Sequence, residues 1–264
     1  LSQNMNNDFF EKNGFIVIKI PHHIRKAIEQ EIKRICLSKL NFSKLSLREI
    51  KKEKFNQIST SVTNLTNDNF LKYFGHSAFR NFSAQVTNLI NKWVKNFVPL
   101  VLKRREASLR YIAEHELNKN KYLKKKQYMA IFRVVRPNRN DVTFPHRDYD
   151  GEIPYYGCYK SPIRLKDRVK IWIPIWGCNK LSSLRLFKSS HLNKKIRIRY
   201  IKKQRRKKPV VDNNFLKKNK SSIIQPIKDY KNSAILFHDR LVHFAAVNKG
   251  KNLRISAEFT VVTN

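Results

Sequence analysis

The chain has 264 residues, enough to bury one good core, and no apolar run in it approaches the roughly 20 residues that a membrane span needs. Its 56 lysines and arginines against 19 acidic residues give a formal net charge of +37. That sign favours nucleic acid, an anionic membrane surface or an acidic substrate as a partner, although an AT-rich gene produces the same lysine-rich composition without one.

Cysteine usage argues against a secreted, disulfide-bonded protein. Cys36, Cys158 and Cys178 are odd in number and have no Cys-x-x-Cys spacing, so neither a disulfide framework nor a thiolate zinc site is indicated. The first ten residues also lack the basic and apolar regions of a signal peptide. We therefore expect a protein of the reducing cytoplasm.

The first half of the chain is predicted to be mostly helical. Residues 13–20 form a short apolar strand, and residues 21–40 begin with a proline and carry apolar side chains every three or four positions, the spacing of an amphipathic helix. More helix is predicted over about 79–118, on both sides of Pro99. We expect residues 1–120 to form a helical elaboration in front of a β-rich core.

Residues 121–264 are predicted to form that core within the same domain. Clusters of Pro, Gly, Asn and Asp separate its β-favouring runs, and no helix-length apolar period lies between them. A parallel sheet with crossover helices is therefore disfavoured, and a sandwich or small barrel is expected. The runs are residues 127–135, 168–176, 183–187, 233–237 and 253–262.

A strongly basic segment is predicted to be an insertion between two strands of the core. Residues 193–220 contain thirteen lysines and arginines. Within them, residues 195–201 alternate basic and apolar side chains, which predicts an edge strand with its charge outward, and residues 202–208 are predicted to form a loop. We expect this insertion to attract an anionic substrate to the site described next.

The stretch FPHRDYDG contains a histidine and an aspartate one residue apart. If this stretch is extended, His146 and Asp148 lie on the same face, because side chains alternate along a strand. The pair alone is a weak metal-site signal and needs a third ligand. His243 offers one in an apolar run, whereas His238, five residues earlier on the same run, would face the opposite way.

A polar turn follows His243 and predicts a hairpin. Folded about residues 248–249, the hairpin would place His243 opposite Arg254, with Ser256 on the same face as Arg254. Two histidines and one carboxylate with vacant positions suit non-haem Fe(II) and O₂ chemistry. An arginine nearby suits a dicarboxylate cosubstrate, because a guanidinium can hold a carboxylate through two hydrogen bonds.

These residues resemble the Fe(II)/2-oxoglutarate dioxygenases, and specifically the phytanoyl-CoA dioxygenase-like branch. The resemblance lies in the H-x-D motif, the distal histidine and Arg254 eleven residues after it. Further support comes from the strand at 172–176, the Ser-Ser-His turn at 189–191 and Asn248, five residues after the distal histidine. The resemblance spans nearly the whole chain.

The resemblance implies a mainly β fold with N-terminal helices, built on a double-stranded β-helix core of the jelly-roll or cupin type. It implies one Fe(II) held by His146, Asp148 and His243, and 2-oxoglutarate held by Arg254 and Ser256. The implied reaction uses O₂ and releases succinate and CO2 while it oxidises a small or medium-sized metabolite. Asp148 stands where halogenating relatives carry a small residue, so hydroxylation, or a related oxidation such as desaturation, is preferred.

A second class of function remains open. The positive charge also suits a basic nucleic-acid-binding protein on a β-barrel scaffold, or an oxygenase that acts on nucleic acid. The sequence shows no signature of the common RNA- or DNA-binding modules, and its ligand-type positions are intact. We therefore favour the enzyme that acts on a small molecule.

Overall fold

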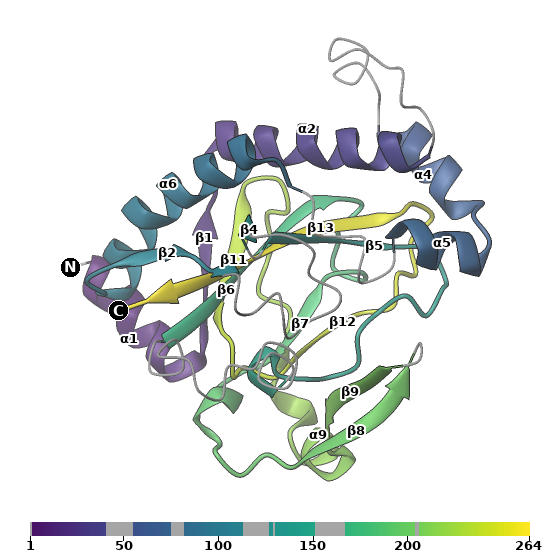
Figure 1. Ribbon diagram of the computed structural model, residues 1–264. Coiled ribbons are helices and arrows are strands. Elements are labelled where there is room, and N and C mark those ends of the chain that lie inside the picture. The colour runs from purple at the N-terminus through teal and green to yellow at the C-terminus, as the bar shows by residue number, and fades with distance from the viewer. Residues whose placement is uncertain are drawn as a thin grey trace.

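The computed structural model describes residues 2–40, 55–74, 82–112, 127–128, 130–150, 167–203 and 206–264. Its helices lie mostly in the first half of the chain, above a sheet whose strands come mostly from the second half (Figure 1). The helices are α1 (Ser2–Asn13), α2 (His22–Lys39), α4 (Phe55–Thr63), α5 (Asn67–Phe74), α6 (Ala84–Leu102) and α9 (Asn213–Lys218), with short 3₁₀ turns η3 (Ser190–Leu192) and η4 (Lys220–Ser222).

The helix expected over residues 79–118 is wrong over 103–112, and residues 79–81 and 113–118 lie outside the described residues. Helix α6 ends at Leu102, because Lys103 adopts a left-handed conformation with φ of 49°. Two short strands follow, β2 (Ala107–Leu109) and β3 (Tyr111–Ile112). Strand β2 pairs with the end of the C-terminal strand, so tertiary pairing overrides the helix propensity of this segment.

The larger sheet is antiparallel and has the order β1, β11, β6, β13, with β5 and β2 along the far edge of β13. It confirms five of the predicted strand regions. Its strands are β1 (Phe15–Lys19), β5 (Ala130–Val135), β6 (Asp167–Trp176), β11 (Ser233–His238) and β13 (Arg254–Thr263).

The smaller sheet has the order β10 (Ile223–Ile224), β7 (Leu184–Phe187), β12 (His243–Ala245). An antiparallel bridge between His146 and His243 extends it by the segment that follows β5. Along the chain, strands therefore pass from one sheet to the other and back, which is the arrangement of a jelly roll. The predicted double-stranded β-helix is confirmed.

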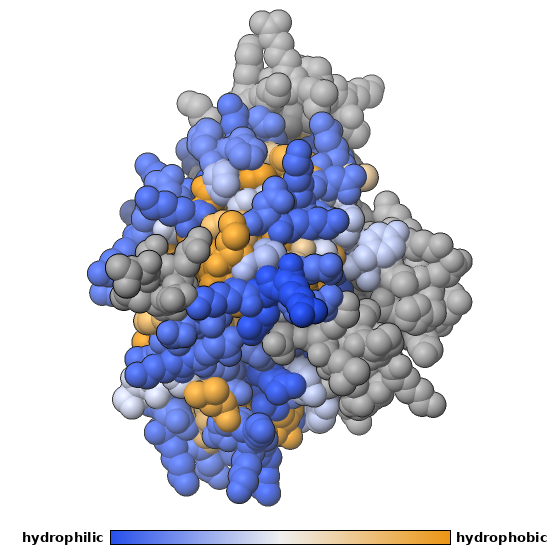
Figure 2. Space-filling view, turned by 90° about the vertical axis from the view of Figure 1, so that its left-hand side faces the viewer, coloured by the Kyte–Doolittle hydropathy of each residue, from blue (hydrophilic) through white to orange (hydrophobic). Residues whose placement is uncertain are grey.

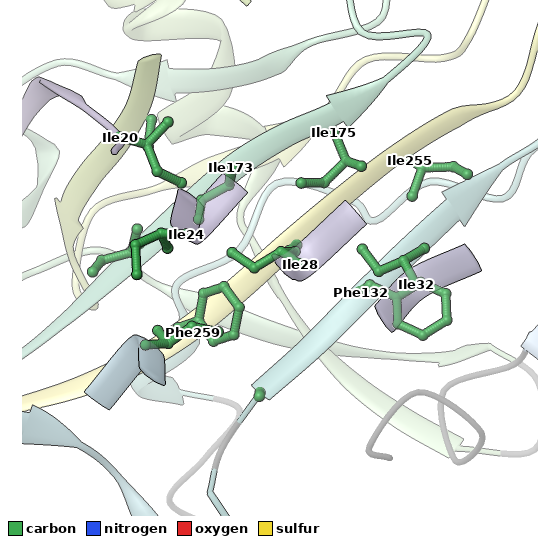
Figure 3. Close-up of a cluster of buried hydrophobic side chains, with 14 of the residues drawn as sticks. Ile20, Ile24, Ile28, Ile32, Phe132, Ile173, Ile175, Ile255 and Phe259 are labelled. Carbon is green, nitrogen blue, oxygen red and sulfur yellow. The ribbon is translucent and has the colours of Figure 1, made fainter. Parts of the chain in front are cut away.

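The main core lies between the larger sheet and the helices. Isoleucines of α2 point at the strands, where they meet the outward-facing residues of β5, β6 and β13 (Figure 3). The labelled members of this cluster are Ile20, Ile24, Ile28, Ile32, Phe132, Ile173, Ile175, Ile255 and Phe259. A second apolar cluster, which includes Trp172, Leu186 and Phe237, lies between the two sheets.

The basic insertion forms its own hairpin below the smaller sheet (Figure 1). Strands β8 (Ile198–Lys203) and β9 (Arg206–Val211) pair only with each other among the described strands. The loop expected over residues 202–208 is wrong, because both strands run through that region, and the expected edge strand starts at Ile198 rather than 195. A second small ladder joins β3 to β4 (Gln127–Tyr128).

The face of the molecule that carries α1 and both termini is mostly hydrophilic, with small separate hydrophobic patches (Figure 2). Within the described residues, no helix has the length and apolar character that a membrane crossing requires. The basic insertion holds thirteen of the 56 lysines and arginines, so most of the positive charge lies outside it.

Candidate metal centre

Three predicted site residues meet at one end of the space between the sheets. Ligand-type atoms of His146, Asp148 and His243 all lie within 4.8 Å of one another. The Asp148 carboxylate bridges the rings, with Oδ1 3.5 Å from His146 Nε2 and Oδ2 3.6 Å from His243 Nε2. Their side chains are 14%, 12% and 4% exposed, so the group is nearly buried. No other group of three such side chains comes together in the described part of the chain.

The backbone holds the two histidines side by side. The His146 N–H donates to the His243 carbonyl at 3.0 Å, and the His243 N–H donates to the His146 carbonyl at 2.9 Å. Asp148 is not on an extended strand as expected, because residues 148–150 are helical. The turn of this helix, rather than the alternation of a strand, brings the carboxylate to the histidines.

Both imidazoles are fixed in the tautomer that a metal ligand needs. His146 Nδ1 lies 2.7 Å from the Phe144 carbonyl oxygen, and His243 Nδ1 lies 2.9 Å from the Leu241 carbonyl oxygen. Because a carbonyl can only accept, each Nδ1 carries the hydrogen and donates it. The lone pair of each Nε2 is then directed at the centre of the group.

Burial and neighbouring charges set the protonation states of His243 and Asp148. Burial lowers the pKa of His243 to about 4, against the opposing effect of Asp148, so this imidazole is neutral at pH 7. Burial raises the pKa of Asp148, but its neighbours, the Lys170 charge first among them, outweigh burial and hold this pKa well below the usual range. A neutral His243 imidazole therefore faces an ionised carboxylate.

One atom of the group has no hydrogen-bond partner. Asp148 Oδ2 is buried, and no described residue donates a hydrogen bond to it. A buried carboxylate oxygen without a donor costs free energy that a bound cation would recover. The donor set of two imidazole nitrogens and one carboxylate, with its partner-free oxygen, fits a divalent transition metal.

Arg254 and Ser256 lie in the other sheet from His243. Strand β12 pairs with β7, whereas β13 pairs with β5 and β6, so the hairpin expected between them is wrong. The chain crosses from the smaller to the larger sheet between β12 and β13, as a jelly roll requires. The local turn pattern could not indicate this crossing.

Both side chains are nonetheless buried on the inner face of β13. The guanidinium of Arg254 donates from Nη1 to the Ser182 carbonyl at 2.9 Å, and its Nε has no partner. No carboxylate of the described residues forms an ion pair with it, and burial lowers its pKa to about 10. Ser256 Oγ is likewise buried without a partner.

Sequence reasoning missed a row of charges next to Asp148. Lys170 Nζ lies 3.5 Å from Asp148 Oδ2 and 3.8 Å from Glu258 Oε1, and it donates to Thr260 Oγ1 at 2.8 Å. Arg133 Nε lies 3.8 Å from Glu258 Oε2. The signal was visible as polar residues at alternate positions of β13, from Arg254 to Thr260, and at Arg168 and Lys170 of β6.

Other histidines and Asn248 take structural positions. The ring of His238 stacks on Phe10 at 6.5 Å and contacts His191 at 5.4 Å, outside the group of three. The Asn248 side chain donates from Nδ2 to the Val135 carbonyl at 3.1 Å and the Asn252 carbonyl at 2.7 Å. It thereby fixes the connection that precedes Arg254.

The fold is similar to that of several solved structures. EctD from S. alaskensis, determined with 2-oxoglutarate and 5-hydroxyectoine, matches 98% of this chain and 75% of its own with a TM-score of 0.57 and 11% identity. AviO1 from Streptomyces viridochromogenes Tue57 matches 98% and 94%, with a TM-score of 0.54 and 8% identity.

The non-heme monooxygenase ThoJ matches 98% of this chain and 77% of its own, with a TM-score of 0.51 and 10% identity. No protein-family model matches the sequence, and no curated protein matches it significantly. The matches to solved structures confirm, at the level of the fold, the resemblance expected from the sequence.

Proposed function

We propose that this protein is a non-haem Fe(II)- and 2-oxoglutarate-dependent oxygenase that hydroxylates a small molecule. The observation that carries the proposal is the buried group of His146, Asp148 and His243, with its partner-free carboxylate oxygen. The fold shared with a non-heme monooxygenase supports the same conclusion. A structural role would leave Asp148 Oδ2 without a hydrogen-bond donor, with only the ion pair to Lys170 Nζ at 3.5 Å to offset its burial.

Fe(II) would be held by the two Nε2 atoms and the Asp148 carboxylate. When bound, it supplies activation of O₂ for oxidation of a substrate C–H bond. The chain contributes the ligand geometry through the paired backbone hydrogen bonds of His146 and His243. It also keeps both rings correctly oriented through the carbonyls of Phe144 and Leu241.

2-Oxoglutarate would be held at its far carboxylate by Arg254 and Ser256. A fully buried guanidinium without a carboxylate partner is costly, and an incoming carboxylate would satisfy both its charge and the free Nε–H. The Ser256 hydroxyl, two residues along the same face, would donate a further hydrogen bond. EctD, of similar fold, was determined with 2-oxoglutarate.

An anionic group on the substrate is part of the proposal. Lys170, Arg133 and Arg254 bring three positive charges to the inner face, against the negative charges of Asp148 and Glu258. The two positive charges of Fe(II) would cancel the two negative charges of 2-oxoglutarate. The inner face would then keep a net charge of +1, which an anionic group on the substrate would neutralise. Hydroxylation is preferred because Asp148 fills the third ligand position, and assignment to the phytanoyl-CoA dioxygenase-like branch stays a prediction.

The test is stoichiometric binding of Fe(II) under anaerobic conditions, followed by release of succinate from 2-oxoglutarate in air. We expect one Fe(II) per chain in the wild type and in His238→Ala, and loss of that site in His243→Ala. His238 is a matched control because it lies on the same run of chain and outside the group. Retention of the iron site in His243→Ala would overturn the proposal.

A further inference from the structure

Residues 193–203 and 206–222 are rich in lysine and arginine, and we name them the basic lobe. We infer that the basic lobe binds the phosphate backbone of nucleic acid, as a surface separate from the iron site. The inference does not rest on the proposed oxygenase function, because it concerns charges on the outside of the smaller sheet.

The basic lobe presents many cations and almost no acid. Asp212 is its only acidic residue, and its carboxylate is used as a helix cap that accepts the Asn214 N–H at 2.8 Å. No ion pair in the described part of the chain involves the exposed cations of the lobe. These are Lys194, Lys195, Arg197, Arg199, Lys217, Lys218 and Lys220.

These charges are held on an ordered scaffold. Strands β8 and β9 pair over six consecutive residue pairs, and the Asp212 N–H donates to the Arg197 carbonyl at 3.0 Å. Ile196 and Val211 are buried against Phe187 and Val242 of the smaller sheet. Cations fixed in this way lose less conformational entropy on binding than those of a flexible tail.

The basic lobe is attached next to the candidate metal centre. The Val211 N–H donates to the Pro145 carbonyl at 2.9 Å, one residue before His146. Phe244, the neighbour of His243, packs on the lobe's apolar cluster. In Figure 1 the lobe projects from the side of the β-core opposite α2, so a long ligand could reach it without meeting the helices.

The distribution of the cations suits a polymer better than a single small anion. They lie just before β8 and on it, on α9 and at η4, so they are spread over several elements of the lobe. A nucleic acid presents a row of phosphates that could contact several of these cations at once, and the release of counterions drives its binding. The exposed ring of Tyr200, on β8 itself, is available to stack on a base.

An anionic membrane is the less suitable partner. Membrane-surface segments combine basic residues with a broad apolar face that enters the lipid. Tyr200 is the one large hydrophobic side chain that the described lobe exposes, and a single ring does not form such a face. Membrane binding is therefore kept as an outcome of the test.

The experiment compares two variants that each lose six positive charges. The lobe variant replaces Lys194, Lys195, Arg197, Lys217, Lys218 and Lys220 with Gln. The control variant replaces Lys12, Lys19, Lys26, Lys92, Lys95 and Lys103, all on α1, α2, α6, β1 or the turn after α6. Arg199 is left in place because its guanidinium donates to Asn213 Oδ1 at 2.9 Å within the lobe.

Binding of a labelled single-stranded DNA of about 20 nucleotides is measured by fluorescence anisotropy over a series of salt concentrations. We expect the lobe variant to bind at least about tenfold more weakly near physiological salt. Its salt slope should fall by roughly 0.7 for every phosphate that the protein no longer neutralises. The control variant should lose about threefold or less, because its charges act only at long range.

Equal losses in both variants would overturn the inference, because net charge alone would then explain binding. Absence of wild-type binding near physiological salt would overturn it as well. So would lobe-dependent binding to vesicles of anionic lipid that exceeds binding to DNA. Asp148→Ala should bind DNA as the wild type does, so failure of the iron proposal would leave this result unchanged.

Discussion

The two faces of strand β13 in the larger sheet are both buried, yet they differ in chemistry. Along β13 every residue but Val262 is buried. Alternate residues face the helices and are apolar, namely Ile255, Ala257, Phe259 and Val261. The residues between them face the smaller sheet and are polar, namely Arg254, Ser256, Glu258 and Thr260.

The comparison shows that burial alone does not identify what stabilises this protein. The outer face gains free energy from apolar packing against the helices. The inner face holds a guanidinium without an anion and a hydroxyl without a partner, and both are costs in the ligand-free chain. On β13, outer-face substitutions should therefore lower the free energy of unfolding and leave cosubstrate binding unchanged. Inner-face substitutions should weaken cosubstrate binding without lowering the free energy of unfolding.

The largest expected effect comes from removing the carboxylate ligand. Asp148→Ala should abolish stoichiometric Fe(II) binding, since only two imidazoles would remain, and equilibrium dialysis measures this loss. Thermal denaturation of the apo-protein checks that the variant is folded. Asp150→Ala is the control, because Asp150 lies two residues away and pairs with Arg147 at 2.6 Å; it should retain the iron.

A matching large effect on the outer face is expected at Phe259. Its ring is fully buried and meets Phe82 edge-on at a centroid distance of 5.7 Å. Phe259→Ala should lower the free energy of unfolding by about 3–5 kcal/mol, because the ring's packing is removed and a cavity remains. Chemical denaturation checks this value. At temperatures where the variant is folded it should still bind one Fe(II), and loss of the site in the folded variant would break the comparison.

Arg254→Ala should next raise the 2-oxoglutarate requirement. The substitution removes a buried, charge-assisted interaction with the cosubstrate carboxylate, worth roughly 2–5 kcal/mol. Arg254→Lys should recover only part of it, because an ammonium cannot form the paired hydrogen bonds, and Ser256→Ala should cost less than either. Succinate release against 2-oxoglutarate concentration is the measurement. An unchanged requirement in Arg254→Ala would place the cosubstrate elsewhere.

The buried charge of Arg254 also leads us to predict an effect on the free energy of unfolding. Arg254→Met keeps much of the side-chain volume and removes the charge, so its free energy of unfolding should equal or exceed that of the wild type. Chemical denaturation of the ligand-free variant is the measurement. A fall of more than about 2 kcal/mol would mean that the guanidinium is a structural group rather than one held for a ligand.

Much of this comparison could be predicted from the sequence, because alternation of residue types fixes which side chains share a face. The strands at 168–176 and 233–237 were predicted from runs of β-favouring residues, and β6 and β11 confirm them. Lys170 and Glu258 follow the same alternation and were overlooked. Placement between sheets could not be predicted, since the turn after His243 looks the same in a hairpin and in a crossing. Asp148 was expected to lie near the histidines because side chains alternate along a strand. It lies near them because residues 148–150 form a helical turn, so the position was right and the reason was wrong.

The smallest effect on stability is expected at Ile255, which follows Arg254 directly and faces the helices. It is the sharpest test of whether the two faces act independently, because it compares neighbouring residues of one strand. Ile255→Val removes one buried methylene and should lower the free energy of unfolding by about 0.5–1.5 kcal/mol. Its 2-oxoglutarate requirement should stay within about twofold of the wild type, since the volume removed lies on the far side of the sheet. Denaturation and succinate release on the same preparation give both numbers. A requirement that rises as in Arg254→Ala would show that the two faces are coupled through the backbone of β13, and the division of the sheet into a stabilising face and a binding face would fail.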